Sequence, residues 1–105
     1  MFVLGCELVL RSDDPLSADD VTELIAAFVD ELDELDLSPD VSTTGVGTEI
    51  VMTVEVETDE TDEMEAFVYA FTSIKAALHC AGVHTGRMVI PTDIRPQAPR
   101  TLQDA

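Results

Sequence analysis

Hydrophobic and polar residues alternate at the start of the chain, which predicts a β-strand over residues 2–11. We expect Asp13-Asp14-Pro15 to end this strand. The spacing then changes to three and four, the period of an amphipathic helix. Ser17 is a good N-cap for this helix, and Ser38-Pro39 is predicted to end it. The apolar stripe of the helix consists of Val21, Leu24, Ile25, Phe28, Leu32 and Leu35.

The pattern returns to alternation in the middle of the chain. Residues 41–44 are typical of a weak strand, 45–47 of a turn and 49–57 of a strong strand. One face of the strong strand is apolar and consists of Ile50, Met52, Val54 and Val56.

A second helical pattern runs over residues 64–81, and Gly82 is a natural residue to follow the end of a helix. Residues 87–94 are predicted to form a last strand, which its proline confines to the edge of a sheet. We expect residues 96–105 to be a C-terminal tail after a single domain over residues 1–95.

The predicted order of elements is strand, helix, strand, strand, helix, strand, which indicates an α+β fold. Two right-handed crossovers and one hairpin favour the ferredoxin-like βαββαβ sandwich, an antiparallel sheet with two helices on one face. The first and third strands are the most apolar, so we expect them at the centre of the sheet. A hydrophobic content of 46% in 105 residues is enough for one core.

The chain is strongly acidic, and its charged residues are unevenly distributed. The formal net charge is −17, from 22 acidic and five basic residues, and residues 1–70 hold 20 acids but only one base. This field argues against direct binding of nucleic acid or of an anionic membrane, and favours a basic protein partner. The more basic residues 71–105 are predicted to lie against an acidic surface of this chain or of a partner, unless the asymmetry is mere drift in composition.

Residues 51–83, VMTVEVETDETDEMEAFVYAFTSIKAALHCAGV, contain a strand, an acidic turn and an alanine-rich helix. The helix ends in an AL-H-x-AG phrase, formed here by Ala77, Leu78, His79, Ala81 and Gly82. This third of the chain resembles a loose group of small uncharacterised acidic proteins of actinobacteria and their phages. Many of these continue into a Gly-Trp phrase, whereas this chain has no Trp and continues with His84-Thr85-Gly86. The resemblance implies no activity.

The number of cysteines and the N-terminal residues indicate the cellular compartment in which the protein is expected. Cys6 and Cys80 are too few for a disulfide framework. The start of the chain, MFVLGCELVLR, lacks the basic region and the cleavage site of a signal peptide. No apolar run approaches the roughly 20 residues of a membrane span. We therefore expect a soluble cytoplasmic protein without membrane contact.

Three nearby side chains, His79, Cys80 and His84, invite a metal site with Cys6 as a fourth ligand. Structural zinc requires four converging ligands, whereas neighbouring helical residues point about 100° apart and Cys6 belongs to the core side of its strand. We predict no metal and no cofactor.

Catalytic motifs are lacking as well. Gly45-x-Gly47 has neither the third glycine nor the helix start that phosphate binding requires, and no Ser/His/Asp or Cys/His order is recognisable. We predict that the protein is not an enzyme. A small-ligand sensor or minor enzyme remains open, because a fold does not determine a function.

The helix dipole affects the carboxylates of the two acidic stretches in opposite ways. The carboxylates of residues 57–65 precede the second helix, where its dipole favours negative charge. Those of residues 30–36 fall in the last turns of the first helix, where the dipole disfavours it. An acidic ridge is predicted opposite the apolar stripe, formed by Glu23, Asp30, Asp33 and Glu34. Three explanations stay open: a solvated face in a salt-adapted host, a docking ridge for a basic partner, or mimicry of a nucleic-acid backbone.

The second helix has the opposite character, because residues 66–81 carry a single charge, Lys75. Its outward side, predicted to be a helix interface, consists of Tyr69, Ser73, Ala76, Ala77 and Cys80. The uncovered sheet face is a second candidate surface, with Val3, Val9, Val51, Thr53, Glu7 and Glu55.

We expect a protein-interaction module that self-associates or engages a basic partner. The alternative is a phage-encoded, nucleic-acid-mimicking inhibitor of a DNA- or RNA-binding protein.

Overall fold

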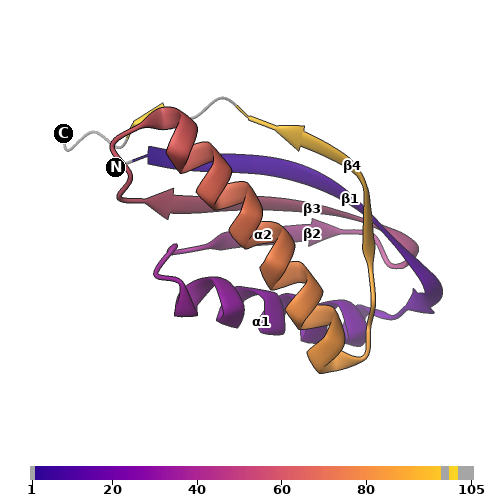
Figure 1. Cartoon of the computed structure of the whole chain (residues 1–105). Coiled ribbons are helices and arrows are strands. Elements are labelled where there is room, and N and C mark those ends of the chain that lie inside the picture. Colours follow the sequence, from indigo (N-terminus) through magenta and orange to yellow (C-terminus); the bar gives the residue numbers. More distant parts are fainter. Residues whose placement is uncertain (1, 98–99, 102–105) are drawn as a thin grey trace.

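The computed structural model describes residues 2–97 and 100–101 and contains five strands and two helices in that part of the chain (Figure 1). The elements in chain order are β1 (Phe2–Leu16), α1 (Ala18–Glu34), β2 (Asp40–Thr44), β3 (Gly47–Thr58), α2 (Glu63–Thr85), β4 (Ile90–Pro96) and β5 (Arg100–Thr101). The sheet is antiparallel with the order β2-β3-β1-β4, and β5 pairs with β1. The first and third strands are central, as predicted. The fold is therefore α+β, with an open sheet and two helices.

One face of the sheet holds the core. Four apolar pairs lie side by side across β1 and β3, each residue no more than 2% exposed: Leu4–Val56, Cys6–Val54, Leu8–Met52 and Leu10–Ile50. The same core includes buried residues of both helices, namely Val21, Leu24, Phe28 and Leu32 of α1 and Ala66, Ala70, Ile74, Ala77, Leu78 and Ala81 of α2. Because strand side chains alternate between faces, both helices cover one face, as predicted.

β1 continues past the point where the sequence predicts its end. Asp13-Asp14-Pro15 lies within β1, and the register with β3 shifts between Arg11 and Leu16. The Ser12 hydroxyl donates a hydrogen bond to the Asp14 carbonyl at 2.6 Å. The turn-like residues therefore form an irregularity of the ladder instead of a strand end, because a local bulge accommodates polar and proline residues.

α1 begins at the predicted cap and ends earlier than expected. The Ser17 hydroxyl accepts from the Asp20 backbone N–H at 3.2 Å, and the Asp20 carboxylate accepts from the Ser17 N–H at 3.0 Å, a capping box. At the other end, the Leu37 N–H donates to the Leu32 carbonyl and the Asp36 N–H to the Asp33 carbonyl. This is a Schellman motif with Asp36 in the left-handed region at φ 57°.

α2 ends four residues later than its first glycine suggests. Gly82 lies buried inside the helix, where an added Cβ would approach the Met88 Sδ to 3.0 Å. Gly86 supplies the left-handed cap instead, at φ 73°. The prediction for Gly82 was wrong, because the helix continues past this residue, whose missing side chain leaves room for the close approach of Met88.

α2 is also long and apolar enough to cross a membrane by length and composition alone. The expectation that no segment reaches this length does not hold by that measure. Core helices of globular proteins share the property, and 44% of the apolar window is buried inside the fold.

The end of the chain follows one edge of the sheet. β4 pairs with β1 from Arg11 to Cys6, the Gln97 N–H donates to the Gly5 carbonyl at 2.9 Å, and β5 pairs beside Val3 and Phe2. The expected tail over 96–105 therefore begins inside β4 and includes a paired segment; residues 98–99 and 102–105 lie outside the described residues. The predicted edge position of the last strand is confirmed.

Candidate functional site

The two acidic stretches, far apart in sequence, meet at one end of the molecule. Figure 1 shows the end of α1, the end of β3 and the start of α2 on the same side of the molecule. A hydrogen bond of 2.7 Å from the Glu57 N–H to the Leu37 carbonyl joins the two segments. The acids after α1 and those before α2 therefore contribute to a single surface.

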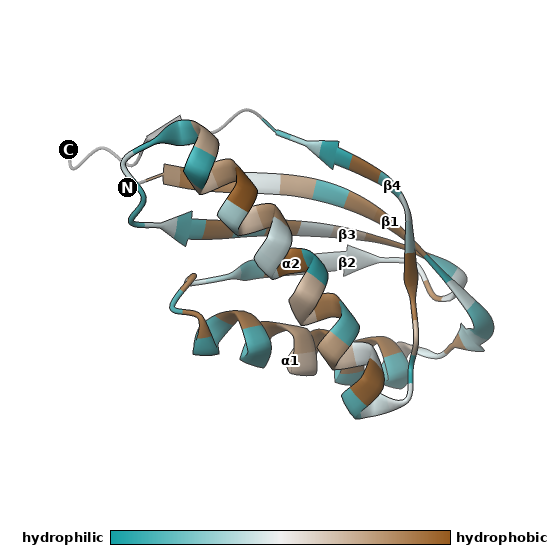
Figure 2. Ribbon diagram, in the orientation of Figure 1, coloured by the Kyte–Doolittle hydropathy of each residue, from teal (hydrophilic) through white to brown (hydrophobic). Residues whose placement is uncertain are grey.

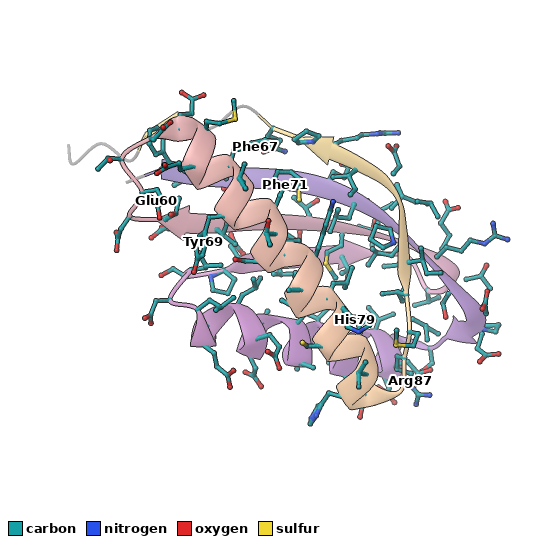
Figure 3. The ribbon with its side chains drawn as sticks, viewed as in Figure 1. Glu60, Phe67, Tyr69, Phe71, His79 and Arg87 are labelled. Atoms are coloured by element: carbon teal, nitrogen blue, oxygen red, sulfur yellow. The ribbon has the colours of Figure 1, made fainter. Side chains whose placement is uncertain are left out.

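A hollow of about 420 Å³ lies between these segments. Its walls are Leu35, Asp36, Leu37, Glu57, Thr58, Asp59, Glu60, Thr61 and Tyr69. Leu35 and Tyr69 are 43% and 40% exposed and offer apolar surface among the carboxylates. Figure 3 shows Glu60 and Tyr69 at this end of the molecule. We call Asp36, Glu57, Asp59 and Glu60, together with Leu35 and Tyr69, the acidic end.

No base neutralises these carboxylates among residues 2–97. The ion pairs there join Arg87 to Asp20 at 2.8 Å, and Arg95 to Glu7 at 3.4 Å and to Asp93 at 2.9 Å. Two of the C-terminal bases thus lie against this chain's own acids, as the charge asymmetry suggested. Their pairs are at other places, so the acidic end retains its charge.

The four predicted residues of the acidic ridge on α1 do not all face the same surroundings. Glu23, Asp30 and Glu34 line a hollow of about 460 Å³ whose other wall includes His84 and Thr85 of α2. Asp33 is exposed and does not line this hollow. The helical pattern could place all four residues on the outer half of α1, but only the position of α2 determines which of them face a groove.

The outward side of α2 differs from its prediction. Tyr69, Ala76 and Cys80 are exposed, whereas Ser73 and Ala77 are 6% and 3% exposed. The correction has a steric reason: α2 packs against α1 and the sheet, and small residues let a helix approach its neighbours closely. The exposed face, which we call the outer face of α2, consists of Met64, Glu65, Val68, Thr72, Ala76, His79 and Val83, flanked by Tyr69, Lys75 and Cys80. Figure 2 shows brown and pale residues along much of α2, with teal residues among them.

The sheet edges and the open face offer less for association. β4 carries Pro91 and Pro96 and a register shift beside Val9, and β2 has only five residues. Prolines, bulges and short strands hinder pairing between sheets. On the open face, Arg95 bridges Glu7 and Asp93, and Val9, Val51 and Thr53 are half-buried.

The two cysteines lie in different environments. Cys6 is buried in the core, and burial raises the pKa of its thiol to about 11. Cys80 is exposed on α2. In the part of the chain that the structure describes, no three His, Cys, Asp or Glu side chains are grouped to hold a metal ion.

Comparisons with protein-family models, with curated proteins and with solved structures find no match. The resemblance of residues 51–83 to small actinobacterial and phage proteins therefore stays a prediction, and the proposals below depend on geometry and charge.

Proposed function

We propose that this protein is a small, non-enzymatic interaction module whose acidic end binds a basic segment of a partner protein. The observation that carries the proposal is the position of Asp36, which follows α1, around one hollow with Glu57, Asp59 and Glu60, which precede α2. Charge of this density, left without basic partners among residues 2–97, destabilises the free molecule and favours a cationic ligand.

The composition of the hollow supports lysine and arginine as the ligands. Their aliphatic stems pack on apolar surface while the charged head stays hydrated, and Leu35 and Tyr69 offer that surface. The tyrosine ring can also face a guanidinium group, an arrangement worth about 0.5–1 kcal/mol at exposed sites. Asp36, Asp59 and Glu60 surround the position of the head group from both segments.

The experiment is a titration of the full chain into a fluorescein-labelled oligo-arginine peptide, followed by anisotropy. We expect binding at low salt that weakens strongly at about 0.5 M NaCl, because exposed charges are then screened within about 4 Å. The triple variant Asp36→Asn, Asp59→Asn, Glu60→Gln is expected to lose affinity at least about tenfold, equal to about 1.4 kcal/mol.

A matched control distinguishes binding at the acidic end from general attraction to the negative net charge of the protein. Asp13→Asn, Asp14→Asn, Glu49→Gln removes the same charge from exposed positions on β1 and β3. We expect this variant to keep most of the affinity. Equal losses in both triple variants would show that only net charge matters and would refute a site at the acidic end.

The finer fold class is also a proposal. The element order βαββαβ and the strand order β2-β3-β1-β4 support the ferredoxin-like sandwich. Resolution of the same order in an experimental structure is the test, and a different order of the central strands would contradict it.

Mimicry of a nucleic-acid backbone is a second candidate, supported by the spacing along α1. Asp30 and Glu34 lie one turn apart, and Glu23 extends the same row along the hollow. As an inhibitor, the protein should displace a lysine-rich DNA-binding protein from a short duplex in a gel-shift assay. The variant Glu23→Gln, Asp30→Asn, Glu34→Gln should fail to do so, and undiminished displacement would remove this candidate.

A further inference from the structure

The outer face of α2 carries one carboxylate, Glu65, on a strongly acidic protein. Between Ala66 and Thr85 the helix has no carboxylate, and its basic side chains are Lys75, His79 and His84. Exposed apolar residues extend along the face, with Met64, Val68 and Val83 exposed by 69%, 56% and 64%. An apolar face on a soluble domain is the kind of surface that another protein covers.

Net charge restricts how a second copy can approach. Two molecules of charge −17 repel each other, so contact is least unfavourable where carboxylates are absent. α2 begins at the acidic end, with Asp62 as its N-cap and Glu63 and Glu65 in its first turn. A parallel pair would bring the two acidic ends together, and an antiparallel pair would separate them.

We infer that two copies of this chain associate through the outer faces of α2, antiparallel about a two-fold axis at Thr72. A two-fold axis at that residue places each position n opposite position 144 − n of the second copy. The pairs it creates across the interface are Glu65 with His79, Val68 with Ala76 and Tyr69 with Lys75.

Each of these pairs is chemically complementary. The Glu65 carboxylate can accept a hydrogen bond from the His79 ring, and the Lys75 ammonium can face the Tyr69 ring. Thr72 and Ala76 are small, so the helix axes can approach closely at the centre. Charge and side-chain size thus agree on one register.

The antiparallel arrangement also reduces repulsion. Glu63 of the two copies would lie 18 residues apart along the paired helices, or roughly 27 Å at 1.5 Å per residue. This distance is about three Debye lengths at physiological ionic strength. Salt added from low ionic strength should strengthen the dimer by screening the general repulsion between two chains of charge −17, whereas it weakens binding of a basic segment at the acidic end.

Disulfide trapping tests the axis directly. In the background Cys80→Ser, the variant Thr72→Cys places one thiol of each copy at the two-fold axis, and Cys6 stays buried. We expect air oxidation to give a covalent dimer, with a yield that rises with NaCl concentration. The matched control is Thr22→Cys in the same background, an exposed threonine on α1. A yield for Thr72→Cys no higher than for the control would overturn the inference.

A charge exchange tests the register in the native cysteine background under reducing conditions. Glu65→Lys is expected to lower the average mass in light scattering at high protein concentration, and Glu65→Lys with His79→Glu to restore it. Loss that the second change does not restore would contradict the pairing of Glu65 with His79. Each test can fail while the acidic end still binds oligo-arginine, because the trapping and charge-exchange variants change none of Asp36, Asp59 or Glu60.

Discussion

Glu34 stands at an unfavourable position, and its reversal to lysine should stabilise the fold. It is the last residue of α1, it is exposed, and the last turn contains no basic residue. A negative charge there opposes the dipole and repels Asp30 and Glu31, which lie four and three residues earlier. Glu34→Lys reverses all three interactions.

The expected gain in stability of Glu34→Lys is the sum of the changes in these three interactions. Each charge near a helix end is worth about 0.3–1 kcal/mol and each pair about 0.2–0.5 kcal/mol, so removal of the negative charge should add about 0.7–2 kcal/mol at low salt and its reversal about twice as much. For 105 residues the entropy of unfolding is about 220 cal/mol/K, so the melting temperature of Glu34→Lys should rise by roughly 6–18 °C. Thermal unfolding followed by circular dichroism measures this, and the gain should shrink in about 1 M NaCl.

Glu63→Lys is the matched control, since it makes the same change of charge at the exposed first position of α2. Both variants relieve the general repulsion of a −17 chain, but Glu63→Lys loses a favourable interaction with its helix dipole. We expect Glu34→Lys to be the more stable of the two. Equal melting temperatures, or a lower one for Glu34→Lys, would refute the explanation by helix position.

Three further predictions concern single residues. Asp36→Gly should raise the free energy of unfolding by about 0.5–1 kcal/mol in urea titrations, because glycine adopts the left-handed conformation without steric cost; a loss of stability would contradict this. Cys80 should react with Ellman's reagent in the native protein while Cys6 reacts only on unfolding, because Cys6 is buried and its pKa is raised to about 11; two equally fast thiols would disprove it. The hydrogen bond from the Ser17 N–H, and then the Ser17 hydroxyl and Arg87, hold the pKa of Asp20 below its ordinary value of 3.8. The stability that this carboxylate adds is therefore present above that value and lost as the pH falls through the lower, folded-state pKa; Asp20→Asn should be less stable than the parent at pH 7, with the difference vanishing in strong acid.

Local patterns in the sequence determined the elements and their inner faces. Alternation identified the buried side of β3, and the spacing of three and four identified the stripe of α1 from Val21 to Leu32. Ser17 was recognisable as a cap because its bonds reach only three residues along the chain. These features depend on neighbours in sequence, so the sequence alone sufficed for them.

Features that depend on distant neighbours were predicted wrongly or not at all. Asp13-Asp14-Pro15 did not end β1, because pairing with β3 continues beyond an irregular register. Gly82 was taken for a helix end because the packing of Met88 against it was not visible in the sequence. The helical periodicity placed Ser73 and Ala77 on the outward side of α2, whereas the neighbouring α1 and sheet bury them.

The acidic residues illustrate the division between sequence and tertiary structure. The sequence determined that residues 57–65 favour the start of α2 and that residues 30–36 oppose the end of α1. Only the tertiary structure decided that Asp36 of the first stretch shares one hollow with Glu57, Asp59 and Glu60 of the second, because the return of the chain through β2 and β3 brings Glu57 within hydrogen-bond distance of Leu37. A charge is local to its residue, but the field that a partner meets is the sum over all segments that the fold brings together.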